Sequence, residues 1–70
     1  MKMWKSFIVC GYLDPVKTTY RLNKELTTLQ EMGWKIDRID CHENIHGLWD
    51  ENNQKYVTTK DYIIIAYIES

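Results

Sequence analysis

The chain of 70 residues is 44% hydrophobic and 27% charged, and its formal net charge is −1. This composition is typical of a globular protein rather than a disordered one, and a net charge so close to zero gives no strong attraction to nucleic acid or to an anionic membrane surface. We expect one domain over residues 1–70, recognised by its partners through shape. A domain this small buries little apolar surface unless a disulfide, a metal or a second copy adds to its core.

Two apolar segments are candidates for a targeting or membrane segment. The first, "MKMWKSFIVCGYLD", is followed by Pro15 and contains no small-residue cleavage site, which argues against a secretory signal. The second, "YIIIAYI", is far shorter than the roughly 20 residues that a membrane helix needs. We therefore expect a cytoplasmic protein that does not associate with a membrane.

Residues 3–13 are rich in aromatic and β-favouring side chains, which predicts a strand. Alternate side chains of a strand point to opposite faces, and both faces of this one are apolar. One face carries Met3, Phe7, Val9 and Leu13, and the other carries Trp4, Ile8, Cys10 and Tyr12. The strand therefore needs apolar cover on both sides.

A helix is predicted over residues 15–32. Asp14 is suited to accept a hydrogen bond from an unpaired amide at the helix start, and Pro15 loses nothing at the first helical position. Gly33 is suited to the left-handed conformation that ends a helix. The stripe expected to be buried contains Leu22, Leu26 and Leu29, with Thr19 before it, and the opposite side carries Lys17, Arg21, Lys24, Thr28 and Glu31.

The sequence after Gly33 predicts a long β-hairpin, with arms at residues 34–49 and 54–69 around "DENN". A turn centred between Glu51 and Asn52 places these pairs opposite each other: Trp49 and Gln54, Gly47 and Tyr56, Asp40 and Ile63, Ile36 and Tyr67. The alternative is a short hairpin with an irregular loop over residues 42–60, although loops of that length are uncommon in compact domains.

The expected fold is a βαββ domain of the α+β class, with one helix on one face of a mainly antiparallel three-stranded sheet. The last strand, apolar on both faces, is expected between the other two. One helix covers only one face, so an apolar face remains exposed, and we expect a second copy to cover it in a homodimer. The residues expected in the dimer interface are Trp4, Ile8, Tyr12, Tyr62 and Ile64.

The segment "CHENIHGLW" contains Cys41, His42 and His46, which are all types of metal ligand. On a regular strand the two histidines point to one side and the cysteine to the other, and no further ligand lies at a recognised spacing. We therefore expect no metal and no cofactor, but half-exposed histidines and a buried cysteine. Cys10 and Cys41 are expected on strands roughly 9.6 Å apart, too far for a disulfide.

The sequence offers no recognisable catalytic arrangement. The three glycines are too far apart to form a phosphate-binding loop, and strand alternation places Asp37 and Asp40 on opposite faces. We therefore expect a protein that is not an enzyme. Nucleic-acid binding through the cations of the helix and the tryptophans is less favoured than a solvated helix face and buried rings.

Trp49 differs from the other tryptophans because the tip of a hairpin offers little core in which to bury it. An exposed aromatic side chain beside acidic residues is a suitable anchor for a protein partner. The residues expected to bind a partner are Trp49, Asp50, Glu51 and Tyr56 at the tip, and Lys17, Arg21 and Lys24 on the helix.

The helix exit "EMGWKI" and the closing strand "DYIIIAYIES" resemble those of short βαββ proteins of unknown function from low-GC bacteria and their phages. The arm "CHENIHGLWDENNQ" is longer than the hairpins of that set, and the resemblance implies no catalytic residues. In size and layout the chain also resembles small phage-encoded inhibitors of bacterial defence, although a fold does not fix a function.

These observations favour a homodimeric, non-enzymatic protein, encoded by a phage or mobile element, that inhibits or modulates a host protein by steric binding. One alternative is a dimer that sequesters a nucleotide or another small signal in a cleft lined by aromatic and basic side chains. A third hypothesis is a metal-dependent enzyme, which requires bound zinc.

Overall fold

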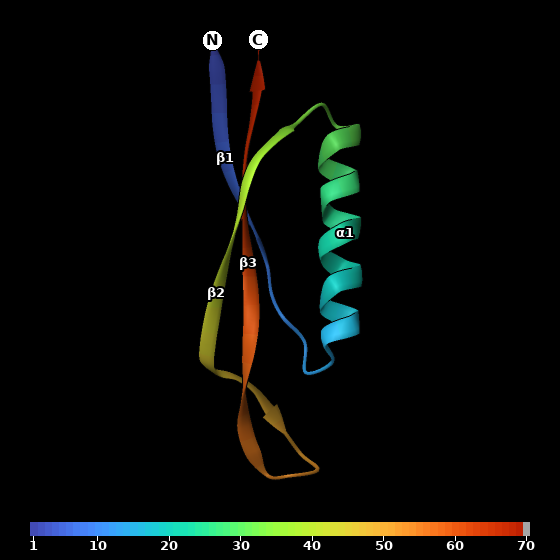
Figure 1. Cartoon of the computed structure of the whole chain (residues 1–70), viewed down its shortest axis with the longest axis vertical. Coiled ribbons are helices and arrows are strands. Elements are labelled where there is room, and N and C mark those ends of the chain that lie inside the picture. The colour runs from blue at the N-terminus through green and yellow to red at the C-terminus, as the bar shows by residue number, and fades with distance from the viewer. Residues whose placement is uncertain (70) are drawn as a thin grey trace.

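The computed structural model describes residues 1–69, and for His46 the backbone only. Its elements, in chain order, are β1 (Lys2–Val9), α1 (Pro15–Glu31), β2 (Lys35–Asp50) and β3 (Lys55–Glu69). As predicted, the fold is of the α+β class, with one helix against an antiparallel sheet (Figure 1).

The strand order in the sheet is β1-β3-β2, and β3 is antiparallel to both neighbours. The ladder between β1 and β3 runs from the pair Lys2 and Glu69 to the pair Val9 and Tyr62. The central position suits β3 because its residues 62–68 are apolar on both faces. Beyond residue 61 towards the turn, β3 pairs with β2 alone, and these two strands form a projecting arm.

Local signals define both ends of α1. The Asp14 carboxylate accepts a hydrogen bond from the Val16 amide at 2.9 Å. At the other end Gly33 has a φ of +91°, and the Trp34 amide donates to the Leu29 carbonyl at 3.0 Å. This backbone bond, together with one from the Gly33 amide to the Gln30 carbonyl at 3.1 Å, is the Schellman arrangement that satisfies the last carbonyls of a helix.

The core lies between α1 and one face of the sheet. Its buried side chains are Val9, Leu29, Ile64 and Ala66, and packed against them are Phe7, Leu22, Leu26, Trp34, Ile36 and Tyr62. Trp34 meets Phe7 edge-on, with ring centroids 5.4 Å apart. The predicted leucine stripe therefore faces the core, but it begins with buried Thr18 rather than with Thr19, which is exposed.

The first strand is shorter than predicted. It ends at Val9, and residues 10–13 form a connection to the helix. The buried Gly11 lies against the backbone of Lys60, where a Cβ atom would collide with the carbonyl group, and its amide donates to the Asp61 carboxylate at 2.8 Å. This close approach redirects the chain, so Tyr12 and Leu13 do not continue the two faces of the strand.

The register of the hairpin was predicted correctly only in its middle. Asp40 faces Ile63 as expected, but Ile36 faces Ala66 rather than Tyr67. Trp49 faces Tyr56 rather than Gln54, and Gly47 packs on Thr59 rather than opposite Tyr56. The causes are two irregularities in β2, between residues 36 and 38 and between residues 44 and 48, and a turn that ends with Gln54 at a φ of 50°.

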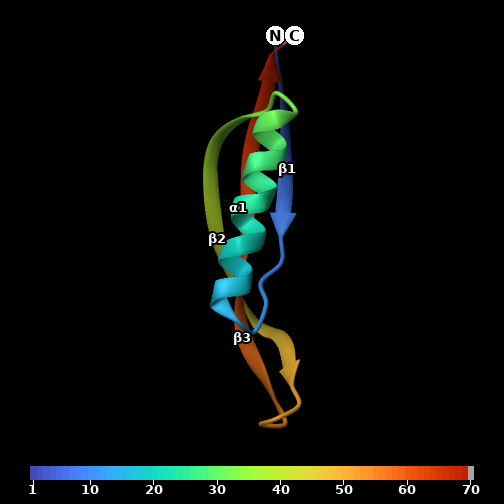
Figure 2. The same cartoon turned by 90° about the vertical axis from the view of Figure 1, so that its right-hand side faces the viewer.

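The molecule is elongated, with extents of 49 × 18 × 12 Å and a radius of gyration of 14.3 Å. A compact chain of this length would have a radius of gyration of about 11 Å. The difference arises from the arm, which extends past the start of α1, while both termini lie at the opposite end (Figures 1 and 2). Within the described residues, no helix is long and apolar enough to cross a membrane.

Candidate functional site

The hairpin tip, residues 48–57, presents a pair of aromatic rings. Trp49 and Tyr56 are directly opposite each other on β2 and β3, with ring centroids 5.1 Å apart and an interplanar angle of 70°. This edge-to-face contact is a favourable geometry for two aromatic rings. Trp49 is nevertheless 48% exposed and Tyr56 60% exposed, so the pair is held in place while much of its apolar surface faces solvent.

Asp50 organises the turn that carries these rings. Its carboxylate accepts hydrogen bonds from the Asn52 amide at 3.0 Å and from the Asn53 side chain at 2.8 Å. The bond from the Asn53 side chain is the main cause that holds the pKa of Asp50 below its ordinary value. Asp50 therefore has a structural role in addition to the binding role predicted for it, while Glu51 is exposed in the turn.

Ile45 also belongs to the apolar surface of the arm, although the sequence analysis gave it no role. It lies in the irregular segment between Asn44 and Leu48, and it is 70% exposed. The pairing with β3 is interrupted there, so the alternation of a regular strand does not locate its side chain. The only signal for this exposed side chain in the sequence was a single apolar residue between His42 and His46.

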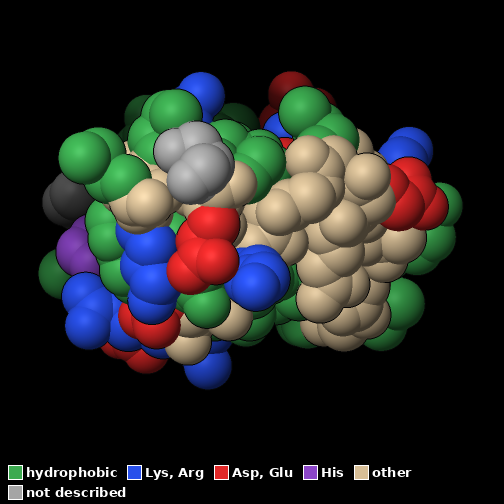
Figure 3. Space-filling model, turned by 90° about the horizontal axis from the view of Figure 1, so that it is seen from above, with side chains coloured by type: hydrophobic (Ala, Val, Ile, Leu, Met, Phe, Trp, Pro, Cys, Tyr) green, Lys and Arg blue, Asp and Glu red, His purple; other side chains and the backbone are tan. Residues whose placement is uncertain are grey.

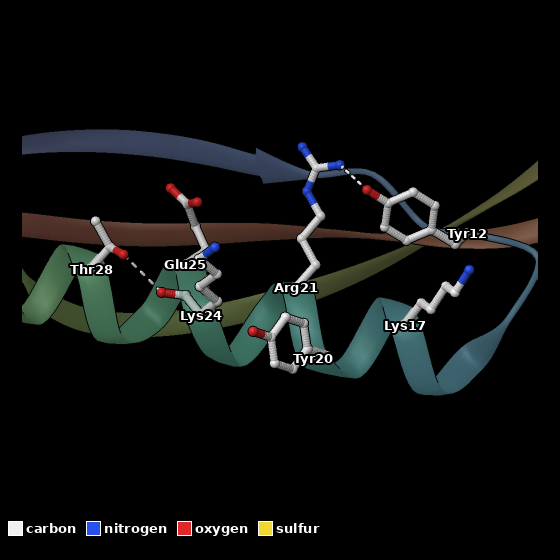
Figure 4. A pocket seen from close by; sticks show the side chains of 7 residues that line it. All are labelled: Tyr12, Lys17, Tyr20, Arg21, Lys24, Glu25 and Thr28. Carbon is white, nitrogen blue, oxygen red and sulfur yellow. Dashed lines mark hydrogen bonds between the residues drawn. The ribbon is translucent and has the colours of Figure 1, made fainter.

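The helix groove is an open hollow of about 580 Å³ along α1. It is lined by Tyr12, Lys17, Tyr20, Arg21, Lys24, Glu25 and Thr28 (Figure 4). The Arg21 guanidinium donates to the Tyr12 hydroxyl at 2.6 Å and lies 5.5 Å from the centroid of that ring. The three cations predicted on the outer side of the helix thus share one concave surface with two tyrosines.

Tyr20 was missed as a lining residue. It follows Lys17 by three positions and precedes Lys24 by four, so helical spacing places it on the same side as the cations. The role of Tyr12 could not be derived in this way, because the connection after β1 brings it over the helix.

The seven residues expected to bind a partner therefore divide between two surfaces. Trp49, Asp50, Glu51 and Tyr56 lie at the hairpin tip, and Lys17, Arg21 and Lys24 lie in the helix groove. Figure 2 shows α1 beside the three-stranded part of the sheet, with the tip beyond its end. A ligand that fills the groove and a partner that holds the tip would contact different elements.

The open sheet face, opposite α1, is the third surface. It carries Trp4 and Ile8 from β1, which are 51% and 68% exposed. Their neighbours across the ladder are Tyr67 and Ile63, with Ile65 between them. The rings of Trp4 and Tyr67 lie 4.9 Å apart, and the Lys2 ammonium group is 4.5 Å from the centroid of the Tyr67 ring.

Two of the residues predicted in the dimer interface were assigned to the wrong face. Ile64 is 0% exposed beneath α1, and Tyr62 packs against the same core. The alternation along β3 was read correctly, but the sequence does not say which side the helix covers. Tyr12 is not on the open sheet face either, because β1 has already ended at Val9.

Both thiols, Cys10 and Cys41, are free and exposed, so the expectation of a buried cysteine was wrong. Cys10 follows the end of β1, and Cys41 lies on the edge strand β2. His42 is also exposed, whereas the side chain of His46 lies outside the described part of the structure. Among the side chains that are described, no three from His, Cys, Asp and Glu are grouped so that they could hold a metal ion.

Charges of both signs are mixed on the surface around the chain ends. Viewed down the long axis, the sheet and the helix form two adjacent lobes, and acidic and basic side chains alternate on the lobe of the sheet (Figure 3). Arg38 and Asp40, both on β2, form an exposed ion pair at 3.5 Å. This end of the molecule therefore presents no surface of a single sign.

Comparison with known proteins identifies no relative: no family model, no curated protein and no solved structure matches the chain.

Proposed function

We propose that this is a non-enzymatic protein that binds another protein through its hairpin tip and acts by steric obstruction. The observation that carries the proposal is the pair Trp49 and Tyr56, exposed at the end of an arm that projects from the rest of the fold. Large aromatic side chains dominate the energetics of many protein interfaces. Their mutual contact reduces the side-chain entropy that binding would otherwise remove.

The chemistry around the pair indicates what kind of partner surface would fit it. Leu48 and Ile45 are further exposed apolar side chains of the arm, and Asp50 and Glu51 add carboxylates at the turn that follows Trp49. An apolar pocket with basic residues at its rim is complementary to this arrangement. We further propose a host defence protein as the partner and a phage or mobile element as the source, and this part of the proposal rests on the resemblance in size and layout.

Homodimerisation through the open sheet face is the second part of the proposal. Only one face of the sheet is covered by α1, and Trp4 and Ile8 are large apolar side chains left half or more exposed on the other. Two copies packed through this face would add a second apolar layer to a small core. The formal net charge of −1 per chain opposes such an association only weakly.

The role of the tip is tested by replacing Trp49. A partner captured from bacterial lysate by the wild-type chain is purified, and its affinity is measured for Trp49→Ala and for the control Tyr20→Ala, which removes an exposed aromatic ring from α1. We expect Trp49→Ala to weaken binding at least about tenfold and Tyr20→Ala to leave it unchanged. Full affinity in Trp49→Ala, with folding verified by circular dichroism, would refute binding through the tip.

A further inference from the structure

We propose that the helix groove is a binding site for a nucleotide, a function that goes beyond the binding of a protein at the hairpin tip. The groove brings together the cations of Lys17, Arg21 and Lys24 and the rings of Tyr12 and Tyr20. Cations suit the phosphate groups of such a ligand, and tyrosine rings suit its base. The volume of about 580 Å³ lies within the range common for small-molecule sites.

The three cations form a row of like charge along the groove. Lys17, Arg21 and Lys24 are separated by four and three positions, so they are neighbours on the surface of α1 and repel one another. Within the described residues none of the three takes part in an ion pair, and Glu25 is the one carboxylate in the lining of the groove. An anion bound between them would remove this repulsion and gain charge-assisted hydrogen bonds.

Arg21 is held in position before any ligand binds. Its guanidinium group donates to the Tyr12 hydroxyl at 2.6 Å and lies 5.5 Å from the centroid of the Tyr12 ring. The backbone of Tyr12 is held in turn, because its amide donates to the hydroxyl of the buried Thr18 at 2.8 Å. Figure 4 shows a terminal nitrogen of Arg21 that is not directed at Tyr12, and a planar guanidinium fixed in this way is suited to bind a phosphate group through two donors.

The rings supply the second element of recognition. Tyr20 is 69% exposed, and it lines the groove with the cations of α1 (Figure 4). Aromatic side chains stack on any nucleobase because every base has a π face. The Glu25 carboxylate, in the same lining, could accept a hydrogen bond from an exocyclic amino group of the base.

The test measures binding of ATP to the full chain by isothermal titration calorimetry, with EDTA present so that the protein supplies the positive charge. We expect measurable binding that weakens at least about tenfold in Arg21→Ala, because a charge-assisted contact with phosphate is lost. The matched control is Arg38→Ala, which removes the same side chain and charge from β2 and should leave ATP affinity unchanged.

Tripolyphosphate, which has no base, separates the two parts of the site. Tyr20→Ala should weaken ATP severalfold and leave the affinity for tripolyphosphate unchanged. The proposal is overturned by an absence of ATP binding at millimolar concentration, by equal losses in the two arginine variants, or by tighter binding of a single-stranded oligonucleotide than of ATP. Trp49→Ala should bind ATP normally, so this test can fail independently of the one for the tip.

Discussion

Gly47 packs closely against Thr59 in the arm. A Cβ atom on Gly47 would run into the hydroxyl of Thr59, and it would come within 2.9 Å of the Thr59 Cβ atom. Thr59 is only 5% exposed, so its side chain has little room to move aside. The absence of a side chain at residue 47 thus allows the arm to bend where the register of β2 shifts.

We therefore expect Gly47→Ala to destabilise the protein by about 1–3 kcal/mol, the usual cost of overpacking. The midpoint of urea unfolding measures the effect. In the double variant Gly47→Ala/Thr59→Ala, removal of the hydroxyl and methyl groups should restore part of the loss. Equal stability of Gly47→Ala and the wild type would show that the packing at this contact is loose.

Asp50 gives the turn a dependence on pH. Its pKa in the folded protein lies below the ordinary value, chiefly because the Asn53 side chain donates to the charged carboxylate. Its contribution to stability is therefore fully present above the pKa of an unfolded aspartate, about 3.9. As the pH falls through the lower folded pKa, the carboxylate is protonated and the contribution is lost.

Carbon-detected NMR titration of the Asp50 carboxyl group should accordingly give a pKa below that of an aspartate in an unstructured peptide. Asn53→Ala should raise this pKa, because the strongest hydrogen bond to the carboxylate is removed. Asn52→Ala should leave it unchanged, since residue 52 donates through its backbone amide. The same pKa in all three proteins would show that the side-chain bond is absent in solution.

At the scale of elements, α1 was predicted almost completely, because its signals are local. Asp14 and Pro15 begin it, and Gly33 follows its end, as the sequence indicated. The apolar stripe was identified by helical spacing within a single segment. Each of these signals acts over a few residues, so knowledge of the rest of the fold was not needed.

Gly33 provides the test at this scale. We expect Gly33→Ala to cost about 1 kcal/mol, because a φ of +91° is unfavourable for a residue with a Cβ atom. The new methyl group would lie 3.6 Å from the Ile68 Cδ1 atom, which is an ordinary contact, so the cost is conformational rather than steric. Met32→Ala, at a φ of −82°, is the control and should change the urea midpoint little. Equal midpoints for the two variants would contradict the left-handed cap.

The strands were predicted less well, because their errors arise from contacts distant in sequence. The register beyond Asn44 depends on the packing of Gly47 on Thr59, and the end of β1 depends on Gly11 against Lys60. The residues next to Gly11 and Gly47 in the sequence do not indicate that another segment packs closely against either glycine. Alternation along a strand also leaves open which face the helix covers, so Tyr62 and Ile64 were assigned to the wrong side.

At the scale of the whole molecule, the sequence predicted those features of the candidate surfaces that depend on neighbouring residues, and it did not predict those that depend on distant contacts. The exposed Trp49 followed from its place at a hairpin tip, and the row of cations followed from helical spacing. The groove itself depends on the connection that brings Tyr12 over α1, and the pairing of Trp49 with Tyr56 depends on the shifted register. Those two features required the assembled fold.

The proposed self-association through the open sheet face would make thermal stability depend on protein concentration. The melting temperature of the wild type should rise with protein concentration, because a dimer is favoured by mass action. Ile8→Lys, which places a charge on that face, should abolish the rise. Ile45→Lys is a matched control, since Ile45 lies on the arm and is 70% exposed against 68% for Ile8. A mass of 8.4 kDa for the wild type by light scattering at high micromolar concentration would refute the dimer.

The pairing of Lys2 with Glu69 puts both chain ends at the pole opposite the hairpin tip. A fluorescent protein, an affinity tag or a surface linker joined at either end would therefore extend away from Trp49 and Tyr56. The same geometry permits oriented immobilisation with the aromatic pair directed towards solution. A sensor chip or an imaging probe built in this way would hold the arm at the far end of a molecule 49 Å long.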